Sequence, residues 1–335
     1  MIQSILISRA DSIGDVILTL PMAGVLKKYF PNVKIGFIGR AYTKPVIEAC
    51  IHVNEFIDVE DFYKQDVLVD GKRPDAIIHV FPLRAIAKRA HKLKIPLRIG
   101  TTNRLYHWTT CNKLIKLSRK NSPLHESQLN LKLLSAFGIK EEFTLNQVAS
   151  YYGLTKIATI SDNLFQLIDK AKFNLIIHPK SQGSAREWGL DNFITLIKLL
   201  DKNKYKIFIS GTSKERVLLS PLFEEAGNLV TDITGKMNLN QFISFINNAD
   251  GLLANSTGPL HIAAALGKHA LGLFPPMRPI HPGRWSPVGS HAHTFVLNKQ
   301  CDDCRNKPEA CSCIHSIQAI EIKNKLDDIS YSVHQ

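Results

Sequence analysis

A turn late in the chain combines residue types that suit the binding of a phosphate. An apolar run over 251–254 predicts a buried strand, and the small residues of 260–266 predict a helix. The connection 255–259 reads NSTGP, so the first helical amides point outward with the positive end of the helix dipole behind them. A phosphate is the natural occupant of such a position. The alternative is an ordinary strand-to-helix crossover in which Ser256 or Thr257 only caps the helix.

Strand and helix patterns alternate along the rest of the chain, which is typical of parallel α/β sheets. In the first half we predict strands at 2–8, 34–39, 56–59, 76–81 and 97–100, with helices at 15–30, 43–49, 84–93, 111–117 and 126–137. In the second half we predict strands at 173–178, 206–210, 228–232, 251–254 and 270–274, with helices at 190–200, 215–226, 238–247 and 260–266. A weaker polar stretch, 140–152, separates the two sets and predicts domains 1–152 and 153–335. Two such domains form a cleft between the carboxyl ends of their strands, where we expect the chemistry.

Composition favours a globular protein with an anionic partner. The 335 residues are 44% hydrophobic, enough for a core in each of two domains. Lys and Arg number 42 against 29 Asp and Glu, a net charge of +13, and much of the excess lies in 84–120. Nucleic acid, an anionic membrane surface and a phosphorylated substrate all fit this balance, as does simple solubility.

Several functional classes lack their sequence signatures. There is no GxGxxG after either domain's first strand, and no GxxxxGK[ST], HExxH or GxSxG anywhere, so nicotinamide, P-loop, zincin and nucleophile-elbow chemistry have no support. No apolar run approaches the roughly 20 residues of a membrane span. The amino terminus has neither a basic leader nor a small-residue cleavage site, so we expect a cytoplasmic protein.

Three separate stretches resemble glycosyltransferase family 9, whose members include the ADP-heptose:lipopolysaccharide heptosyltransferases. They are ILISRADSIGDVILTLPMAGVLKKYFP, IIHPKSQGSAREWGLDNFITLI and ANSTGPLHIAAALGKHALGLF, in the family's order and in both domains. The resemblance implies a GT-B architecture, in which two Rossmann-like domains face one another across a cleft. It implies acceptor binding by the first domain and nucleotide-sugar binding by the second.

In the first domain the resemblance assigns the catalytic base to Asp15. An inverting transfer requires the acceptor hydroxyl to lose its proton as its oxygen attacks the anomeric carbon, and a positioned carboxylate performs that step. The alternative for Asp15 is a helix cap. Arg9, Asp11 and Gly14 belong to the same loop, and Arg9 could hold an acidic or phosphorylated acceptor by bidentate pairing.

In the second domain the resemblance places the donor. Arg186 falls at a phosphate contact that would neutralise charge on the departing nucleotide, with Lys180 and Ser181 in the same loop. The alternative for Arg186 is an exposed loop charge. The remaining expected donor contacts are Ser256 on the sugar, the Thr257 hydroxyl and Gly258 amide on phosphate, Glu215 on the ribose and the Met237 backbone on adenine, with His261 ranked lower because a lone histidine is more often structural.

One departure from the family pattern concerns the sugar. Ser256 stands where the heptosyltransferases commonly have an Asp that contacts the donor sugar. This difference is compatible with the fold and with phosphate binding, but it leaves the identity of the sugar open, with heptose the first expectation.

The resemblance also gives the basic first domain a use. A lipid-anchored, phosphorylated inner-core saccharide would lie at the cytoplasmic face of the inner membrane of a Gram-negative bacterium. We expect basic helices around 84–94 and 113–120 to hold the enzyme there peripherally and in a salt-sensitive manner.

Four of the six cysteines crowd into CDDCRNKPEACSC near the carboxyl terminus: Cys301, Cys304, Cys311 and Cys313. Four thiolates can surround one tetrahedral zinc ion, whereas a reducing compartment disfavours disulfides. A structural zinc site is one interpretation and free thiols are the other. The resemblance implies that sugar transfer itself needs no metal or other cofactor.

The leading hypothesis is therefore an inverting, metal-independent glycosyltransferase. A non-catalytic nucleotide-sugar or anionic-glycan binding protein of the same fold is the first rival, and an epimerase that shares the architecture is a weaker one. Charge alone suggests a nucleic-acid-binding protein, but no stacking platform or known binding motif accompanies it, so we expect no nucleic-acid partner.

Overall fold

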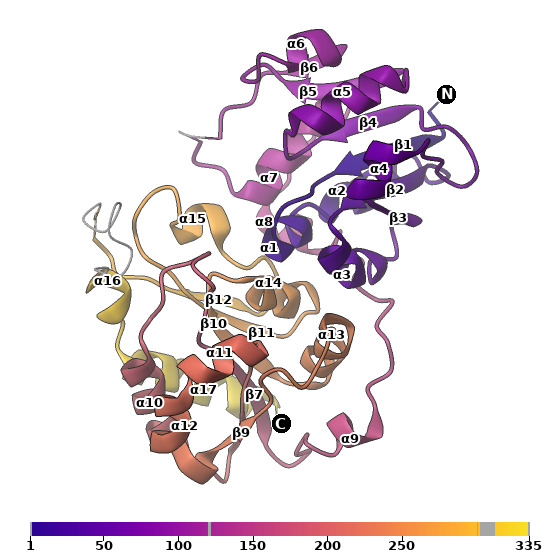
Figure 1. The fold of residues 1–335 in the computed structure, drawn as a ribbon. Coiled ribbons are helices and arrows are strands. Elements are labelled where there is room, and N and C mark those ends of the chain that lie inside the picture. The colour runs from indigo at the N-terminus through magenta and orange to yellow at the C-terminus, as the bar shows by residue number, and fades with distance from the viewer. Residues whose placement is uncertain (1, 120–121, 300, 302–311, 334–335) are drawn as a thin grey trace. The chain divides into compact units, whose positions relative to one another are not determined.

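The computed structural model describes residues 2–119, 122–299, 301 and 312–333. The chain divides into two compact units, Met1–Lys156 and Ile157–Gln335, where the sequence suggested a junction at 152/153. Each unit is a single parallel sheet with helices packed on it (Figure 1).

Unit 1, Met1–Lys156, has a six-stranded sheet in the order β3-β2-β1-β4-β5-β6. Every strand pair in it is parallel. Its elements are β1 (Ser4–Ser8), α1 (Ile13–Ile17), α2 (Pro21–Tyr29), β2 (Lys34–Gly39), η1 (Ala41–Thr43), α3 (Lys44–Glu48), β3 (Glu55–Asp58), α4 (Val59–Lys64), β4 (Ala76–His79), α5 (Arg84–Lys92), β5 (Leu97–Thr101), α6 (His107–Thr110), β6 (Lys113–Ile115), α7 (Glu126–Leu131), η2 (Lys132–Phe137) and α8 (Leu145–Ala149).

Unit 2, Ile157–Gln335, repeats the topology in the order β12-β11-β10-β7-β8-β9, again with parallel pairs throughout. Its elements are α9 (Asp162–Phe165), β7 (Phe173–His178), α10 (Leu190–Leu199), β8 (Tyr205–Ile209), α11 (Ser213–Leu218), α12 (Ser220–Ala226), η3 (Gly227–Leu229), β9 (Val230–Asp232), α13 (Leu239–Asn248), β10 (Gly251–Asn255), α14 (Gly258–Ala265), β11 (His269–Leu273), α15 (Pro282–Trp285), β12 (Ala292–Phe295), α16 (Ser312–His315) and α17 (Ala319–Val333).

Both sheets have the doubly wound strand order, in which the winding direction reverses once. The reversal lies between β1 and β4 in unit 1 and between β7 and β10 in unit 2. Ligands of such sheets bind at the carboxyl ends of the strands beside the reversal. The expected two-domain Rossmann-like α/β architecture is confirmed, and the loops after β1, β7 and β10 become the first places to look for a site.

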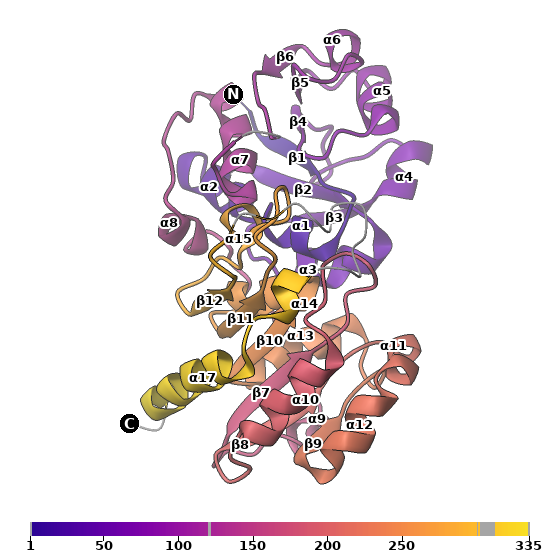
Figure 2. The same ribbon diagram turned by 90° about the vertical axis from the view of Figure 1, so that its left-hand side faces the viewer.

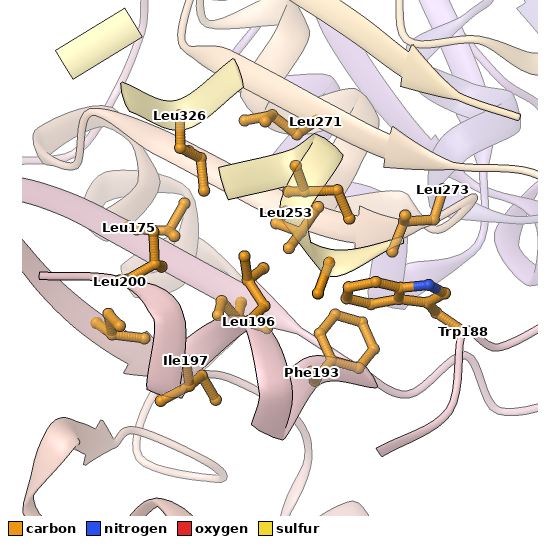
Figure 3. Packing of buried hydrophobic residues seen from close by; sticks show 14 of the residues in the cluster. Leu175, Trp188, Phe193, Leu196, Ile197, Leu200, Leu253, Leu271, Leu273 and Leu326 are labelled. Atoms are coloured by element: carbon orange, nitrogen blue, oxygen red, sulfur yellow. The ribbon is translucent and has the colours of Figure 1, made fainter. Parts of the chain in front are cut away.

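The strands form where the sequence is continuously apolar, because parallel strands are covered on both faces. All five residues of β1 and of β10 are buried. In unit 2 one core cluster joins β7, β10 and β11 to α10 and α17. Figure 3 shows Leu326 of α17 above Leu175 and Leu196, with Trp188 beside Phe193. This packing fixes the sheet whose carboxyl edge carries the loops.

The structure corrects several predicted helices. The helix predicted over 215–226 is two helices, α11 and α12, the second of which has Pro221 in its first turn. The helix predicted over 15–30 is two helices, α1 and α2, because Pro21 has no amide hydrogen to continue the ladder and begins a new helix instead. The helix predicted over 111–117 is wrong: Lys113–Ile115 is the edge strand β6, paired with Ile99–Thr101. An apolar run this short does not distinguish strand from helix by its spacing.

Candidate functional site

The turn between β10 and α14 has an unused hydroxyl at the start of a helix. Thr257 is the residue that precedes the first turn of α14, and its side chain makes no capping hydrogen bond. The residue is 7% exposed, and its Oγ1 finds no hydrogen-bond partner within the part of the chain that the structure describes. Burying a hydroxyl without a partner is unfavourable. The Thr257 hydroxyl therefore does not cap α14 by a hydrogen bond, and it lies buried, unpaired among the described residues, beside the first amides of that helix.

Asn255, the last residue of β10, fastens this turn to the loop that follows β7. Its side chain is fully buried. The amide nitrogen donates to the carbonyl of Pro179 at 2.7 Å, and the amide oxygen accepts from the backbone N–H of Trp188 at 3.0 Å. Both ends of the β7–α10 loop are thus held against the end of β10, at the reversal point of the unit 2 sheet.

The β7–α10 loop carries the expected phosphate contacts and has its own internal anchor. The Glu187 carboxylate accepts from the backbone N–H and the hydroxyl of Ser181, at 2.9 and 3.0 Å, and pairs with the Lys180 ammonium. Arg186 is half-buried in this loop, two residues before the buried Trp188. The three expected residues therefore share one fixed loop, although the Lys180 ammonium already has a carboxylate partner.

Trp188 holds the carboxyl side of the same loop in the core. Its indole N–H donates to the carbonyl of Ile317 at 2.9 Å, and its ring lies edge-on to Phe193 at 4.9 Å between centroids (Figure 3). Nearby, Asn192 donates to the carbonyl of His315 at 2.9 Å. The residues just before α17 thus hold the carboxyl-terminal end of the β7–α10 loop in place.

The expected nucleoside contacts lie in the next two loops along the same edge of the sheet. Glu215 is 4% exposed, and its carboxylate accepts from the backbone N–H and hydroxyl of Thr212, at 2.7 and 2.9 Å, in a capping box at the start of α11. This use of the carboxylate favours a structural role over the expected ribose contact. Met237 is half-buried in the turn before α13, and the two loops touch, since the N–H of Gly235 donates to the carbonyl of Gly211 at 2.8 Å.

His261 and Ser256 complete the expected donor set. His261 is 4% exposed in the first turns of α14, as expected of a structural histidine, and Ser256 is half-buried beside Thr257. The loops after β7, β8, β9 and β10 therefore bring all the expected donor residues of unit 2 to one edge of its sheet.

At the corresponding edge of unit 1, Arg9 is the centre of a buried cluster of carboxylates. It is 3% exposed. Its Nε donates to Asp11 at 2.8 Å, one terminal nitrogen donates to Glu126 at 3.2 Å and the other pairs with Asp15. Burial lowers the pKa of Arg9, but the three carboxylates outweigh it and raise the pKa above its usual range. All three nitrogens are engaged within the protein, which fits a group that orients Asp15 better than a contact for an acceptor.

The side chain of Asp15 does not cap α1, because Ser12 fills that role. Ser12 caps α1 by accepting from the backbone N–H of Asp15, and the Ser12 hydroxyl also contacts Asp15 Oδ2 at 2.5 Å. The Asp15 side chain is 19% exposed, so a substrate hydroxyl can reach it, and Gly14 beside it is half-buried. Burial raises the pKa of Asp11 to about 6; the positive charge of Arg9 acts against this rise, and the negative charge of Asp15 adds to it. Two carboxylates with one shared cation therefore lie at the end of β1.

Sequence reasoning missed the residues that hold these loops. Glu126 is 1% exposed and lies between the guanidinium groups of Arg9 and Arg119. Asn255 and Glu187 have the same kind of role in unit 2. A buried polar residue directly after a strand was the only signal for Asn255, and Glu126 gave none because its partner Arg9 is 117 residues away.

The cysteine cluster lies partly outside the described residues, since Cys304 and Cys311 fall there. Cys301 is half-buried and Cys313 buried. Among the residues that the structure describes, no group of three or more His, Cys, Asp or Glu could hold a metal ion. In the same part of the chain, no helix is both long enough and apolar enough to cross a bilayer.

Known proteins share both the sequence and the fold. A protein of Haemophilus influenzae described as a candidate glycosyltransferase is 24% identical, with 98% of this chain and 96% of that protein covered. The structure of Escherichia coli ADP-heptose lps heptosyltransferase II superposes with a TM-score of 0.76 at 17% identity, covering 99% of this chain and all of that one. E. coli heptosyltransferase WaaC with ADP gives 0.72 at 16% identity, covering 98% and 100%. These structures show the shared fold.

The family model for glycosyltransferase family 9 (heptosyltransferase) matches residues 88–315. That match spans both units, including the strands and loops on which the unit 2 site is built. The chain belongs to glycosyltransferase family 9.

Proposed function

We propose that this protein is an inverting glycosyltransferase that moves a sugar, heptose from ADP-heptose in the first instance, onto a lipopolysaccharide inner-core or related lipid-linked saccharide. Membership of the family supports glycosyl transfer, and structural relatives named as heptosyltransferases, one of them with ADP, support the donor. The donor, the acceptor, the stereochemistry and independence from metal are parts of the proposal.

The observation that carries the proposal is the unused Thr257 hydroxyl at the start of α14. It lies beside the β7–α10 loop, which Asn255 holds in place and which contains Lys180, Ser181 and Arg186. A diphosphate would receive a hydrogen bond from Thr257 and from the first amides of α14, including that of Gly258. Arg186 would neutralise the charge that builds on the leaving nucleotide, which lowers the energy of the transition state.

Asp15 would act as the general base. Its carboxylate takes the proton of the acceptor hydroxyl while that oxygen bonds to the anomeric carbon of the donor. The bond from this carbon to the phosphate oxygen breaks, the electron pair leaves on the nucleoside diphosphate and the anomeric configuration inverts. Arg9 holds the carboxylate in place, since it is itself fixed by Glu126 and Asp11. General-base catalysis of this kind contributes about 10²–10⁴ in rate.

The experiment compares wild type with Asp15→Asn. Thermal unfolding is measured with ADP-, UDP- and GDP-sugars to find the donor, because a ligand of the native state raises the melting temperature. Transfer to a lipid-linked inner-core acceptor is then followed with the best donor. Asp15→Asn should lose about 10²–10⁴ in turnover and keep the affinity for the donor.

Asp61→Asn is the matched control, because it alters an exposed first-turn carboxylate of α4 in the same unit and should change nothing. Donor binding without transfer in wild type would favour the rival, a non-catalytic nucleotide-sugar binding protein. Release of free sugar in the absence of acceptor would favour the epimerase.

The basic face of unit 1 would keep the enzyme at the cytoplasmic face of an anionic membrane. A structural zinc ion at the cysteine cluster also remains a proposal. Metal analysis of protein purified without chelators tests it: about one zinc per chain would support a four-thiolate site, and a trace amount would indicate free thiols.

A further inference from the structure

Fifty consecutive residues of unit 1 carry positive charge alone. Between 76 and 125 the chain has eleven Lys and Arg and neither Asp nor Glu. Some of these cations serve the fold: Arg98 donates to the carbonyls of Thr110 and Ile95, and Arg89 contacts Phe62 and Asp66. Arg119 pairs with the buried Glu126, and Lys120 lies outside the described residues. The remaining seven cations are exposed to solvent and need a different explanation.

The exposed cations gather on and beside three neighbouring elements, α5, α6 and β6. Arg84, Lys88, Lys92 and Lys94 are exposed on and just after α5. Arg104, Lys113 and Lys116 are exposed around α6 and the edge strand β6. Helices α5 and α6 contact one another, and Figures 1 and 2 both show α5, α6 and β6 together at one end of the unit 1 sheet.

Two large apolar side chains project from the middle of this basic surface. Leu105 is 89% exposed, the most exposed large hydrophobic residue of the described chain, and Trp108 is 61% exposed. The indole N–H of Trp108 donates to the carbonyl of Thr102 at 3.1 Å. The polar edge of the ring is therefore satisfied by the protein itself, and its hydrocarbon part can enter an apolar phase without leaving a donor unpaired.

The turn that carries these side chains is held in shape. Tyr106, between them, donates its hydroxyl to the carbonyl of Pro82 at 2.7 Å. The buried His107 ring accepts from the backbone N–H of Thr101 at 2.9 Å, which ties the turn to β5. A fixed turn presents Leu105 and Trp108 at little further cost in conformational entropy.

Cations around an apolar, Trp-containing tip are the pattern of a surface that lies on an anionic bilayer. A nucleic acid would use the cations but has no partner for an exposed Leu. We propose that α5, the turn 102–110 and β6 form a bilayer-docking surface, with Leu105 and Trp108 entering the boundary between headgroups and acyl chains. This inference deepens the proposed function. It rests on that function in one respect only: a lipid-linked acceptor would explain why the enzyme docks on a bilayer.

The test uses sedimentation of the full chain with vesicles of phosphatidylcholine mixed with phosphatidylglycerol, against phosphatidylcholine alone. Wild type should bind the anionic vesicles and lose affinity as salt is raised. Leu105→Ser with Trp108→Ser should bind about tenfold or more weakly, because two apolar groups no longer leave water. Lys88→Glu with Lys92→Glu should also bind more weakly, by about fivefold for each cation removed.

Two controls separate the anchor from a general effect. Val217→Ser with Leu218→Ser removes two apolar side chains that are 74% and 58% exposed on α11 of unit 2, and this variant should bind vesicles as wild type does. Trp108→Phe keeps an apolar ring without the indole N–H and should retain most of the binding.

Unchanged vesicle binding by Leu105→Ser with Trp108→Ser would overturn the proposal, as would a preference of wild type for duplex DNA or RNA over anionic vesicles at equal salt. Asp15→Asn should bind vesicles normally. Vesicle binding without any sugar transfer would therefore reject the proposed function alone, and transfer without vesicle binding would reject the docking surface alone.

Discussion

Replacing Thr257 by Val should change stability and ligand affinity in opposite directions. Val has nearly the same shape and the same β-branch, which suits the extended backbone of Thr257 at φ −130° and ψ 168°. Only the hydroxyl is lost. Because that hydroxyl is buried and has no partner among the described residues, its removal takes away a penalty that the ligand-free protein bears.

Both magnitudes follow from this geometry. An unpaired buried hydroxyl costs about 1–3 kcal/mol, so Thr257→Val should raise the free energy of unfolding by about 1 kcal/mol or more. A hydrogen bond to a charged group is worth about 1.5–3 kcal/mol. The affinity for ADP should therefore fall about tenfold to a hundredfold.

Urea denaturation without ligand measures the first quantity, and titration calorimetry with ADP measures the second. Thr257→Ser is the control, since it keeps the hydroxyl and should keep the affinity. A Val variant that binds ADP as tightly as wild type would show that the hydroxyl does not contact phosphate. A Val variant that is less stable than wild type would show that the hydroxyl has a partner inside the protein.

Three further perturbations test buried polar side chains, two of them supports of the sites and the third His79, the last residue of β4. Asn255→Leu leaves the Trp188 N–H and the Pro179 carbonyl unpaired, so the free energy of unfolding measured in urea should fall by about 2–6 kcal/mol. The rise in melting temperature with ADP should also be lost. Normal ADP binding by this variant would contradict the role of Asn255 in holding the β7–α10 loop. Glu126→Gln removes the buried carboxylate charge that lies between two guanidinium groups and should cost about 3–5 kcal/mol in the same assay, whereas Glu141→Gln, at a surface carboxylate, should leave the unfolding midpoint nearly unchanged. Burial lowers the pKa of His79 to about 3. As the pH falls below about 6.5, His79 therefore binds a proton in the unfolded chain but stays neutral in the folded chain. Between pH 7 and 5 wild type should lose about 2 kcal/mol that His79→Leu keeps, and parallel pH profiles of the two proteins would contradict this.

The fold could be predicted from the sequence because parallel strands are marked locally. β1 and β10 are continuous apolar runs that stop at polar turns, and this pattern needs no knowledge of distant residues. The same property places Asp15 and Thr257 at strand ends, where doubly wound sheets bind their ligands. β6 was mistaken for a helix because its three residues are too few to show a period.

The supports of the site could not be predicted because they depend on partners far along the chain. Asn255 contacts residues 67 and 76 positions away, and Arg9 meets Glu126 across 117. Glu215 is the converse case. Its capping box with Thr212 is a local pattern that sequence reasoning passed over in favour of a ligand contact.

The hydrogen bond from Trp188 to Ile317 places the last part of the chain against the β7–α10 loop. A premature stop codon before Ile317 would remove the carbonyl that accepts the indole hydrogen bond, together with α17. The loop would then lose its order although none of its own codons had changed, so a frameshift near the 3′ end of the gene should have the same effect as a disruptive substitution within the β7–α10 loop.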